Sequence, residues 1–195
     1  MSDDKKTHEL LKLAAASASR VVAGAGEIDF GRPTPSPGWD VRELANHFIV
    51  WSAYALERRG LRQELGEDVT GRDFVGEADW RAEYETTMDH ALEVWSDPKT
   101  FEGEIGTGHS AMAAGDIATM LLLETVLHSW DFAKATGQDY VTDPALGEGV
   151  LPLVEQWAEM YRQYDGFGEP VEVPAGASAM DRALALSGRD PNWTP

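Results

Sequence analysis

The sequence contains no cysteine. This absence excludes disulfides, thiolate zinc ligands and cysteine nucleophiles, and it is compatible with a reducing compartment. No apolar run approaches the roughly 18 residues that a membrane-spanning helix needs. The first residues also lack the apolar segment of a secretory signal. The cytoplasm is therefore the expected location, and a membrane is not an expected partner.

Basic residues are scarce as well, with 16 Lys and Arg against 34 Asp and Glu and a net charge of −18. Such a field repels a phosphate backbone and an anionic lipid surface, so nucleic acid is not an expected partner either. The 195 residues are 43% hydrophobic, which is ordinary globular usage. A chain of this size is expected to form one domain over residues 1–195.

Apolar residues recur at helical spacing in five segments, and strand patterns are nearly absent. One helix is expected to begin at Asp40, where Glu43 completes a capping-box pair. Another is expected to begin at Asp143 and Pro144, although Pro152 should kink it or delay its true start. The expected helices cover about 7–23, 40–60, 79–95, 113–136 and the segment from 144 onward, with a last helical turn near 180–187.

The remaining segments are predicted to be mainly loops. Residues 61–78 should contain at most a short turn, whereas 99–112 and 171–173 could be locally extended. These features predict an all-α fold, an up-and-down four-helix bundle with an extra C-terminal helix and long crossover loops. Exposed faces of such a bundle permit a homodimer.

Ionisable residues interrupt two of the apolar helical faces. His47 lies beside the apolar face of the second predicted helix, and Glu124, His128 and Asp131 follow one face of the fourth. A buried carboxylate without a partner is costly. A carboxylate and two imidazoles form a recognised zinc set with one position left open, and the i, i+4 spacing lets Glu124 and His128 reach one ion. Nickel or iron would also accept these ligands.

Simpler interpretations of these residues remain. Glu124 and His128 could form an ion pair within one helix, and His47 could be a core histidine bonded to a carbonyl. The other histidines are weaker candidates: His8 is expected to be exposed, His90 to lie at the surface or between helices, and His109 to lie in a glycine-rich loop. The tryptophans on helical faces are expected to be mostly core residues, with Trp51 or Tyr54 as alternative pocket residues.

Two segments resemble signatures of one superfamily. Residues 35–47, Pro-Ser-Pro-Gly-Trp-Asp-Val-Arg-Glu-Leu-Ala-Asn-His, resemble the Pro-x-x-x-Trp-x-Val-x-x-Leu-x-x-His signature of DinB-like proteins. More narrowly, they resemble the N-terminal metal-binding domain of mycothiol-dependent maleylpyruvate isomerases. Residues 124–137, which begin Glu-Thr-Val-Leu-His-Ser-Trp-Asp, are similar to the second signature of that family. The tail from Asp181 to Trp193 is similar to that of single-domain members described only as metal-binding.

The resemblance implies a four-helix bundle that binds a divalent metal, usually zinc, through His47, Glu124 and His128. Asp131 would orient His128, or would serve as a cap or salt-bridge partner. The implied activity is isomerisation or S-transfer with mycothiol or a similar low-molecular-weight thiol as cosubstrate. A metal lowers the pKa of a thiol, so a thiolate could attack a small electrophilic substrate. Arg42 or Arg58 could hold an anionic substrate.

The isomerases carry an additional C-terminal domain that helps bind substrate, and the chain is expected to lack it. Maleylpyruvate is therefore an uncertain substrate. Two other functions stay open: a biosynthetic enzyme that acts on a larger apolar substrate without a thiol, and a non-catalytic metal-binding module. An aromatic-lined cavity would favour the first, and a closed, fully coordinated site would favour the second.

Overall fold

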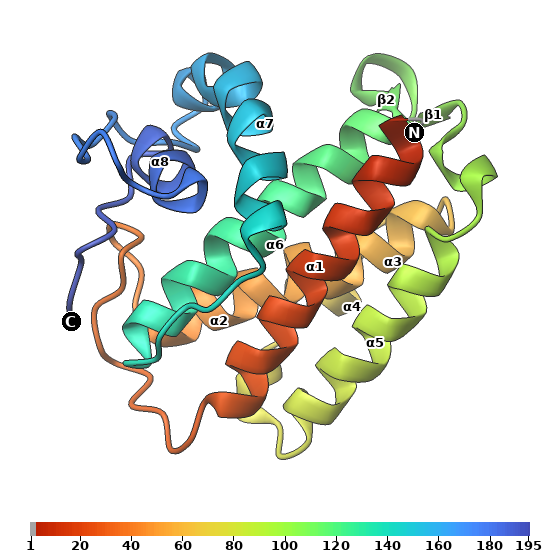
Figure 1. Ribbon diagram of the computed structural model, residues 1–195. Helices are drawn as coiled ribbons and strands as arrows, with labels where there is room; N and C mark the ends of the chain where they lie inside the picture. Colours follow the sequence, from red (N-terminus) through yellow and green to blue (C-terminus); the bar gives the residue numbers. More distant parts are fainter. Residues whose placement is uncertain (1–2) are drawn as a thin grey trace.

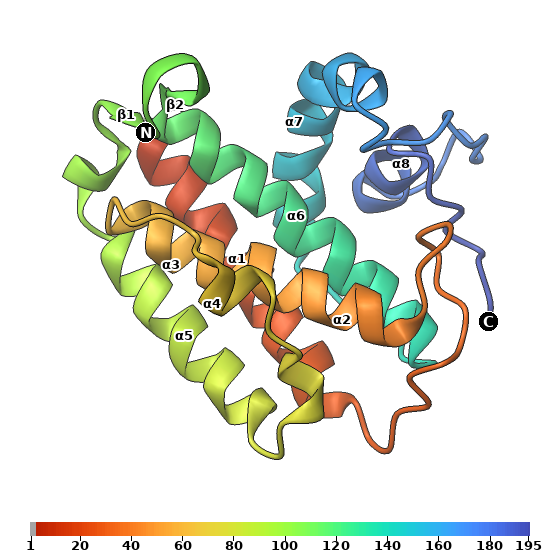
Figure 2. The same ribbon diagram turned by 180° about the vertical axis from the view of Figure 1, so that it is seen from behind.

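A computed structural model describes residues 3–195, and Figures 1 and 2 show it from opposite sides. Four helical rods form a bundle, in which α2 and α3 together make one rod. The first rod, α1, packs against α5 and α6, while α2 packs against α6 and α3 against α5. The predicted all-α bundle is confirmed. The bundle helices are α1 (Asp3–Gly24), α2 (Val41–Ile49), α3 (Ala55–Gly60), α5 (Trp80–Val94) and α6 (Ala114–Ala135).

The long crossover predicted between helices is also present. In both views the α2–α3 rod and α5 run in the same direction, so residues 61–79 must return along the bundle between them. This segment contains the short helix α4 (Glu67–Thr70) and the 3₁₀ turn η2 (Phe74–Gly76), which is slightly more structure than the sequence predicts.

The segment between α5 and α6 holds the expected small extended piece. The strands β1 (Glu104–Ile105) and β2 (Met112–Ala113) pair antiparallel, with Glu104 opposite Ala113. Two 3₁₀ turns, η3 (Pro98–Phe101) and η4 (Gly108–Ser110), complete the connection. Residues 171–173 form no strand, although the Val171 amide donates to the Ala185 carbonyl.

Helix α2 starts where the sequence predicts. The Asp40 side chain accepts from the Glu43 amide at 2.9 Å, and the Glu43 carboxylate accepts from the Asp40 amide at 3.0 Å. This capping box satisfies two amides that a helix start leaves unpaired. It fixes the beginning of the helix that carries His47, two turns further on.

Two helices follow the bundle. Helix α7 (Pro144–Gln163) packs on α1 and α6, and α8 (Ala179–Leu186) packs on α7. Gly147 allows α7 and α8 to pack closely. A Cβ atom at this position would lie 2.7 Å from the Met180 amide nitrogen, which is too near for any larger residue. No helix in the described part of the chain is both long and apolar enough to cross a membrane.

Of the two effects predicted for Pro152, a kink or a delayed start of its helix, the delayed start is wrong. Helix α7 begins at Pro144 behind its Asp143 cap and continues through Pro152. Proline removes the amide that would bond the Glu148 carbonyl. Both Pro152 and Glu148 are exposed, so water can solvate that carbonyl and the helix tolerates the proline.

Candidate metal centre

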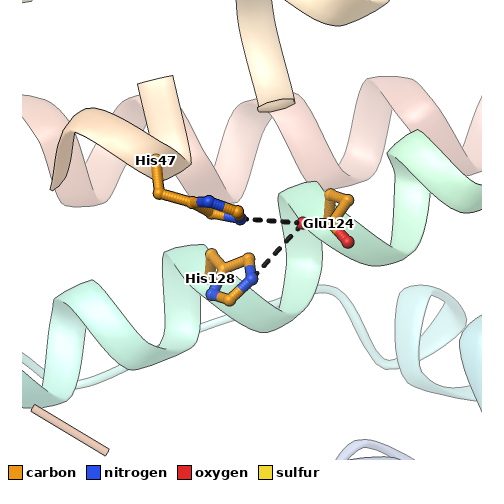
Figure 3. Close-up of side chains that lie close together, drawn as sticks. All are labelled: His47, Glu124 and His128. Carbon is orange, nitrogen blue, oxygen red and sulfur yellow. Dashed lines mark hydrogen bonds and ion pairs between the residues drawn. The ribbon is translucent and has the colours of Figure 1, made fainter. Parts of the chain in front are cut away.

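The three residues singled out by the sequence meet between α2 and α6. Figure 3 shows His47 reaching from α2 toward Glu124 and His128, which stand one turn apart on α6. The Glu124 Oε2 atom lies 3.3 Å from Nε2 of His47 and 3.3 Å from Nε2 of His128. One ligand atom from each residue lies within 4.8 Å of the others, so the group could hold a metal ion. All three side chains are partly buried.

The 3.3 Å separations fit ligands around an ion. They are long for a charge-assisted hydrogen bond, which is usually shorter than about 2.9 Å. Two atoms at about 2.0–2.1 Å from zinc, at the tetrahedral angle, are themselves about 3.3 Å apart. Glu124 stands in this relation to both histidines. The donor set, two imidazoles and one carboxylate, therefore fits a divalent metal in chemistry and in spacing.

A π-helical turn follows His47. The sequence predicts an unbroken helix over 40–60, but η1 (Val50–Tyr54) interrupts it between α2 and α3. At its start, the Val50 amide is shared by the carbonyls of Asn46 and His47. Such turns are rare and often lie at functional sites. No feature of the local sequence predicts this one.

Asp131 backs the site from the core. Its side chain is fully buried, and Oδ2 lies 2.9 Å from Nδ1 of His128. Arg189 forms a bidentate contact with the same carboxylate, in which Nε donates to Oδ1 at 2.9 Å and Nη2 donates to Oδ2 at 2.8 Å. The Ser36 hydroxyl adds a bond of 3.1 Å. In the neutral form of His128, which a metal ion requires, donation from Nδ1 to Asp131 leaves the Nε2 lone pair toward Glu124 and His47.

A tight turn brings Arg189 to this position. Gly188 has φ +88°, and a side chain there would lie 2.6 Å from the Gly168 Cα atom. Only glycine accepts both the left-handed conformation and the close backbone approach. The segment after α8 is thereby fixed against the segment after α7, beside the site.

The charges at the site stabilise one another. Burial opposes ionisation of Glu124, but hydrogen bonds from His128 and His47 outweigh it and hold the pKa of Glu124 well below its usual range. Burial likewise disfavours the charged form of His128, yet its bonds to Asp131 and Glu124 raise its pKa to about 9. Burial raises the pKa of Asp131, whereas the Arg189 charge and the His128 bond lower it to about 2.

These shifts predict a pH dependence of stability for the metal-free protein. The raised pKa of His128 stabilises the fold fully below about pH 6.5, the usual value for the unfolded chain. That contribution is lost as the pH rises through about 9. In urea denaturation with a chelator present, we expect the free energy of unfolding to fall over this interval, and we expect His128→Gln to flatten the fall. A rise in the stability of the metal-free wild type would contradict the assignment.

A cleft opens on the site. Its volume is about 520 Å³, and the exposed edges of His47, Glu124 and His128 form part of its lining. The cleft is bounded by the proline-rich loop before α2 and by segments that follow α7 and α8. A ligand can therefore reach the three side chains from one side. The other lining residues are Pro35, Ser36, Pro37, Trp39, Tyr161, Asp165, Gly166, Phe167, Gly168, Ser187, Gly188 and Arg189.

Trp39 separates this cleft from a second hollow. Its ring centroid lies 4.6 Å from that of His47 and 5.8 Å from that of His128. The second hollow, of about 550 Å³, shares Trp39 and His47 with the first and is also lined by Trp51 and Arg42. The alternative interpretation of Trp51 as a pocket residue is confirmed, whereas Tyr54 is buried and bonded to Glu83.

The two arginines suggested as anion holders have other partners. Arg42 pairs with Asp73 at 2.6 Å, and Arg58 pairs with Asp68 at 3.3 Å. Arg58 lines neither hollow in the described part of the chain. The arginine that lines the cleft beside His47, Glu124 and His128 is Arg189, which sequence reasoning missed.

The other histidines lie outside the site. His8 is half-buried rather than exposed, with Nε2 3.3 Å from the Leu92 carbonyl. His90 is exposed at the surface, one of the two places expected for it, and its Nδ1 atom lies 2.6 Å from Glu57. His109 is in η4, and its side chain lies outside what the structure describes.

Sequence reasoning also missed Ser36, Tyr161 and Phe167. Ser36 and Trp39 could have been predicted as site residues, because both belong to the Pro35–His47 segment that resembles the family signature. Arg189 belongs to the tail that resembles single-domain relatives. Tyr161 and Phe167 carried no signal, because α7 reads as an ordinary amphipathic helix followed by a loop.

The fold and the side-chain cluster define a class of protein: a four-helix bundle with a potential His, Glu, His metal site between two of its helices. Residues 11–133 match the family model described as the mycothiol maleylpyruvate isomerase N-terminal domain. This match covers more than half of the chain, so the protein belongs to that family. It includes His47, Glu124, His128 and Asp131, but it ends before Tyr161 and Arg189.

A solved structure shares the fold. The crystal structure of a mycothiol-dependent maleylpyruvate isomerase matches with a TM-score of 0.65 and 13% sequence identity, over 98% of this chain and 91% of that one. The match thus extends well beyond the family model, over most of the length of both chains. No curated protein matches the sequence.

Proposed function

We propose that His47, Glu124 and His128 bind a divalent metal ion, with zinc the preferred candidate, and that the protein is a thiol-dependent enzyme. It would transfer a mycothiol-like low-molecular-weight thiol to a small electrophile, or isomerise that electrophile through a thiol adduct. The observation that carries the proposal is the pair of 3.3 Å separations around Glu124 Oε2, beside an open cleft. Membership of the isomerase domain family supports it.

The residues around the site fit such a reaction. A bound zinc ion would lower the pKa of the thiol and so supply a thiolate nucleophile at neutral pH. Asp131 holds the His128 ring through Nδ1, and Arg189 and Ser36 hold Asp131. Trp39, Phe167 and the prolines of the loop before α2 give the cleft apolar walls, which limit the water around the reacting groups.

The number of protein ligands favours catalysis over a purely structural metal. Structural zinc sites are closed by four protein ligands, whereas catalytic sites keep an open position. Here three side chains converge, and the nearby carboxylate of Asp131 is already held by Arg189 and His128. The cleft of about 520 Å³ gives a substrate access to the open side. A larger apolar substrate without a thiol is the alternative that the assay below distinguishes.

Two assays of zinc-loaded protein with mycothiol test the proposal. Consumption of the thiol measures S-transfer to a model electrophile such as an aryl halide, and the change in ultraviolet absorbance of maleylpyruvate measures isomerisation, which returns the thiol. Because the chain has no cysteine, the protein adds no thiol to a colorimetric assay. We expect metal-dependent turnover that disappears in Glu124→Ala and persists in Glu155→Ala, whose side chain is exposed on α7. An absence of turnover with every thiol would refute the thiol reaction.

A further inference from the structure

Helix α7 carries, near its end, a hydroxyl with no hydrogen-bond partner. The Tyr161 Oη atom is buried and unpaired among the described residues. A buried polar atom left unpaired costs free energy, and such atoms in a folded protein call for a reason. Tyr161 lines the same cleft as His47, Glu124 and His128. Because that atom has almost no exposed surface, a ligand in the cleft would supply the missing partner after a small shift of the surrounding side chains.

The Tyr161 ring is held in one place. Phe167 stacks on it, with ring centroids 4.5 Å apart and planes inclined by 13°. The Gly166 amide donates to the Tyr161 carbonyl at 2.8 Å, and a side chain on Gly166 would lie 2.8 Å from the ring Cδ1. The turn after α7 therefore folds back on the ring. A donor fixed in this way loses little entropy when it binds a ligand.

The hydroxyl keeps its proton. Burial raises the pKa of Tyr161 above its usual value, and the charge of Glu124 raises it further. At neutral pH the group is thus a neutral phenol that can donate one hydrogen bond. The influence of Glu124 also places the phenol within electrostatic range of the three-residue cluster.

We infer that Tyr161 is a ligand-binding residue of this site, whose O–H donates to the anionic oxygen or sulfur atom that enters the cleft on the open side of His47, Glu124 and His128. The inference rests on the proposed function, because the metal would attract the anion to that side. It adds a residue from outside the matched domain, and it identifies the ligand class as a thiolate or carboxylate.

The charge balance around the cleft favours an anion there only when the metal is present. The Glu124 and Asp131 carboxylates face the Arg189 guanidinium and the two imidazoles. A further carboxylate, Asp165, lines the cleft. A divalent cation adds two positive charges and displaces the proton of His128, so the group gains one net positive charge. The Tyr161 hydroxyl then provides an uncharged donor, which can bind an anion without attracting one into the metal-free protein.

Cobalt-loaded protein provides a test without turnover, because the visible spectrum of Co²⁺ changes when an added ligand joins it. The probes are 2-mercaptoethanol for sulfur and acetate for oxygen, each titrated into wild type and Tyr161→Phe. We expect the variant to keep one cobalt per chain and to bind one or both probes about tenfold more weakly, since it lacks one bond to a charged group. The matched control is Tyr164→Phe, whose side chain is exposed three residues further on.

The outcomes separate this inference from the proposed function. Equal probe affinities in wild type and Tyr161→Phe, with normal cobalt content, overturn the role of Tyr161 alone. Loss of cobalt from Tyr161→Phe overturns it too, because the hydroxyl would then be a metal ligand. Absence of cobalt from the wild type would overturn the proposed metal site and the inference with it. Thermal unfolding of the variant should occur no lower than in wild type, since the lost hydroxyl has no partner in the fold.

Discussion

Glu124→Gln is expected to lower the zinc affinity of the protein by more than about 100-fold, the upper range for loss of a residue that only supports a ligand. Glu124 is the sole carboxylate of the cluster, and its Oε2 atom is equally distant from both histidine nitrogens. Glutamine keeps the size of the side chain but removes the negative charge. Competition with a chromophoric chelator measures the change.

The matched control for this substitution is Glu155→Gln. Glu155 lies exposed on α7 and lines neither hollow, so its replacement should leave zinc affinity unchanged. A Glu124→Gln variant that binds zinc as tightly as the wild type would mean that the carboxylate is only an ion-pair partner of His128. The simpler interpretation of the i, i+4 pair would then hold.

Arg189→Ala is expected to destabilise the protein by about 3–5 kcal/mol, because it leaves a buried carboxylate without its main countercharge. Asp131 has no exposed side-chain surface, and Arg189 bonds both of its oxygens. His128 and Ser36 remain as partners, but they do not replace the bidentate contact. Urea denaturation measures the loss. Arg182→Ala, at an exposed position of α8, is the control and should stay within about 0.5 kcal/mol of wild type.

A second substitution tests the cause of this loss. Adding Asp131→Asn to Arg189→Ala removes the uncompensated charge, so the double variant should be more stable than Arg189→Ala alone. The double variant should also bind zinc more weakly than wild type, since His128 loses the charged acceptor that fixes its ring. A cost for Arg189→Ala below about 1 kcal/mol would contradict the described burial of the pair.

The cluster could be predicted from sequence because helical spacing fixes part of its geometry. Glu124 and His128 share a face of α6 whatever the tertiary fold, and an apolar helix that carries two such groups needs a partner. His47 was the polar residue on the facing helix. The capping box at Asp40 and the buried character of α6 also followed from local pattern.

The residues around the cluster could not be predicted in the same way. Arg189 and Tyr161 reach the cleft only because α7 crosses α1 and α6 and α8 folds back on α7, which is tertiary packing without a local signature. The π turn after His47 likewise depends on how the α2–α3 rod packs, since residues 50–54 contain no glycine or proline that would interrupt a regular helix. Local patterns thus gave the candidate ligands but not the cleft that surrounds them.

Anomalous diffraction at the zinc absorption edge, from crystals of the untagged protein grown with zinc, tests the central claim most directly. The account predicts one strong peak per chain, about 2 Å from the ligand atoms of His47, Glu124 and His128 and facing the cleft that Tyr161 lines. An absence of density there in crystals that hold zinc elsewhere would contradict it. The three side chains would then be a polar cluster that pairs its own charges.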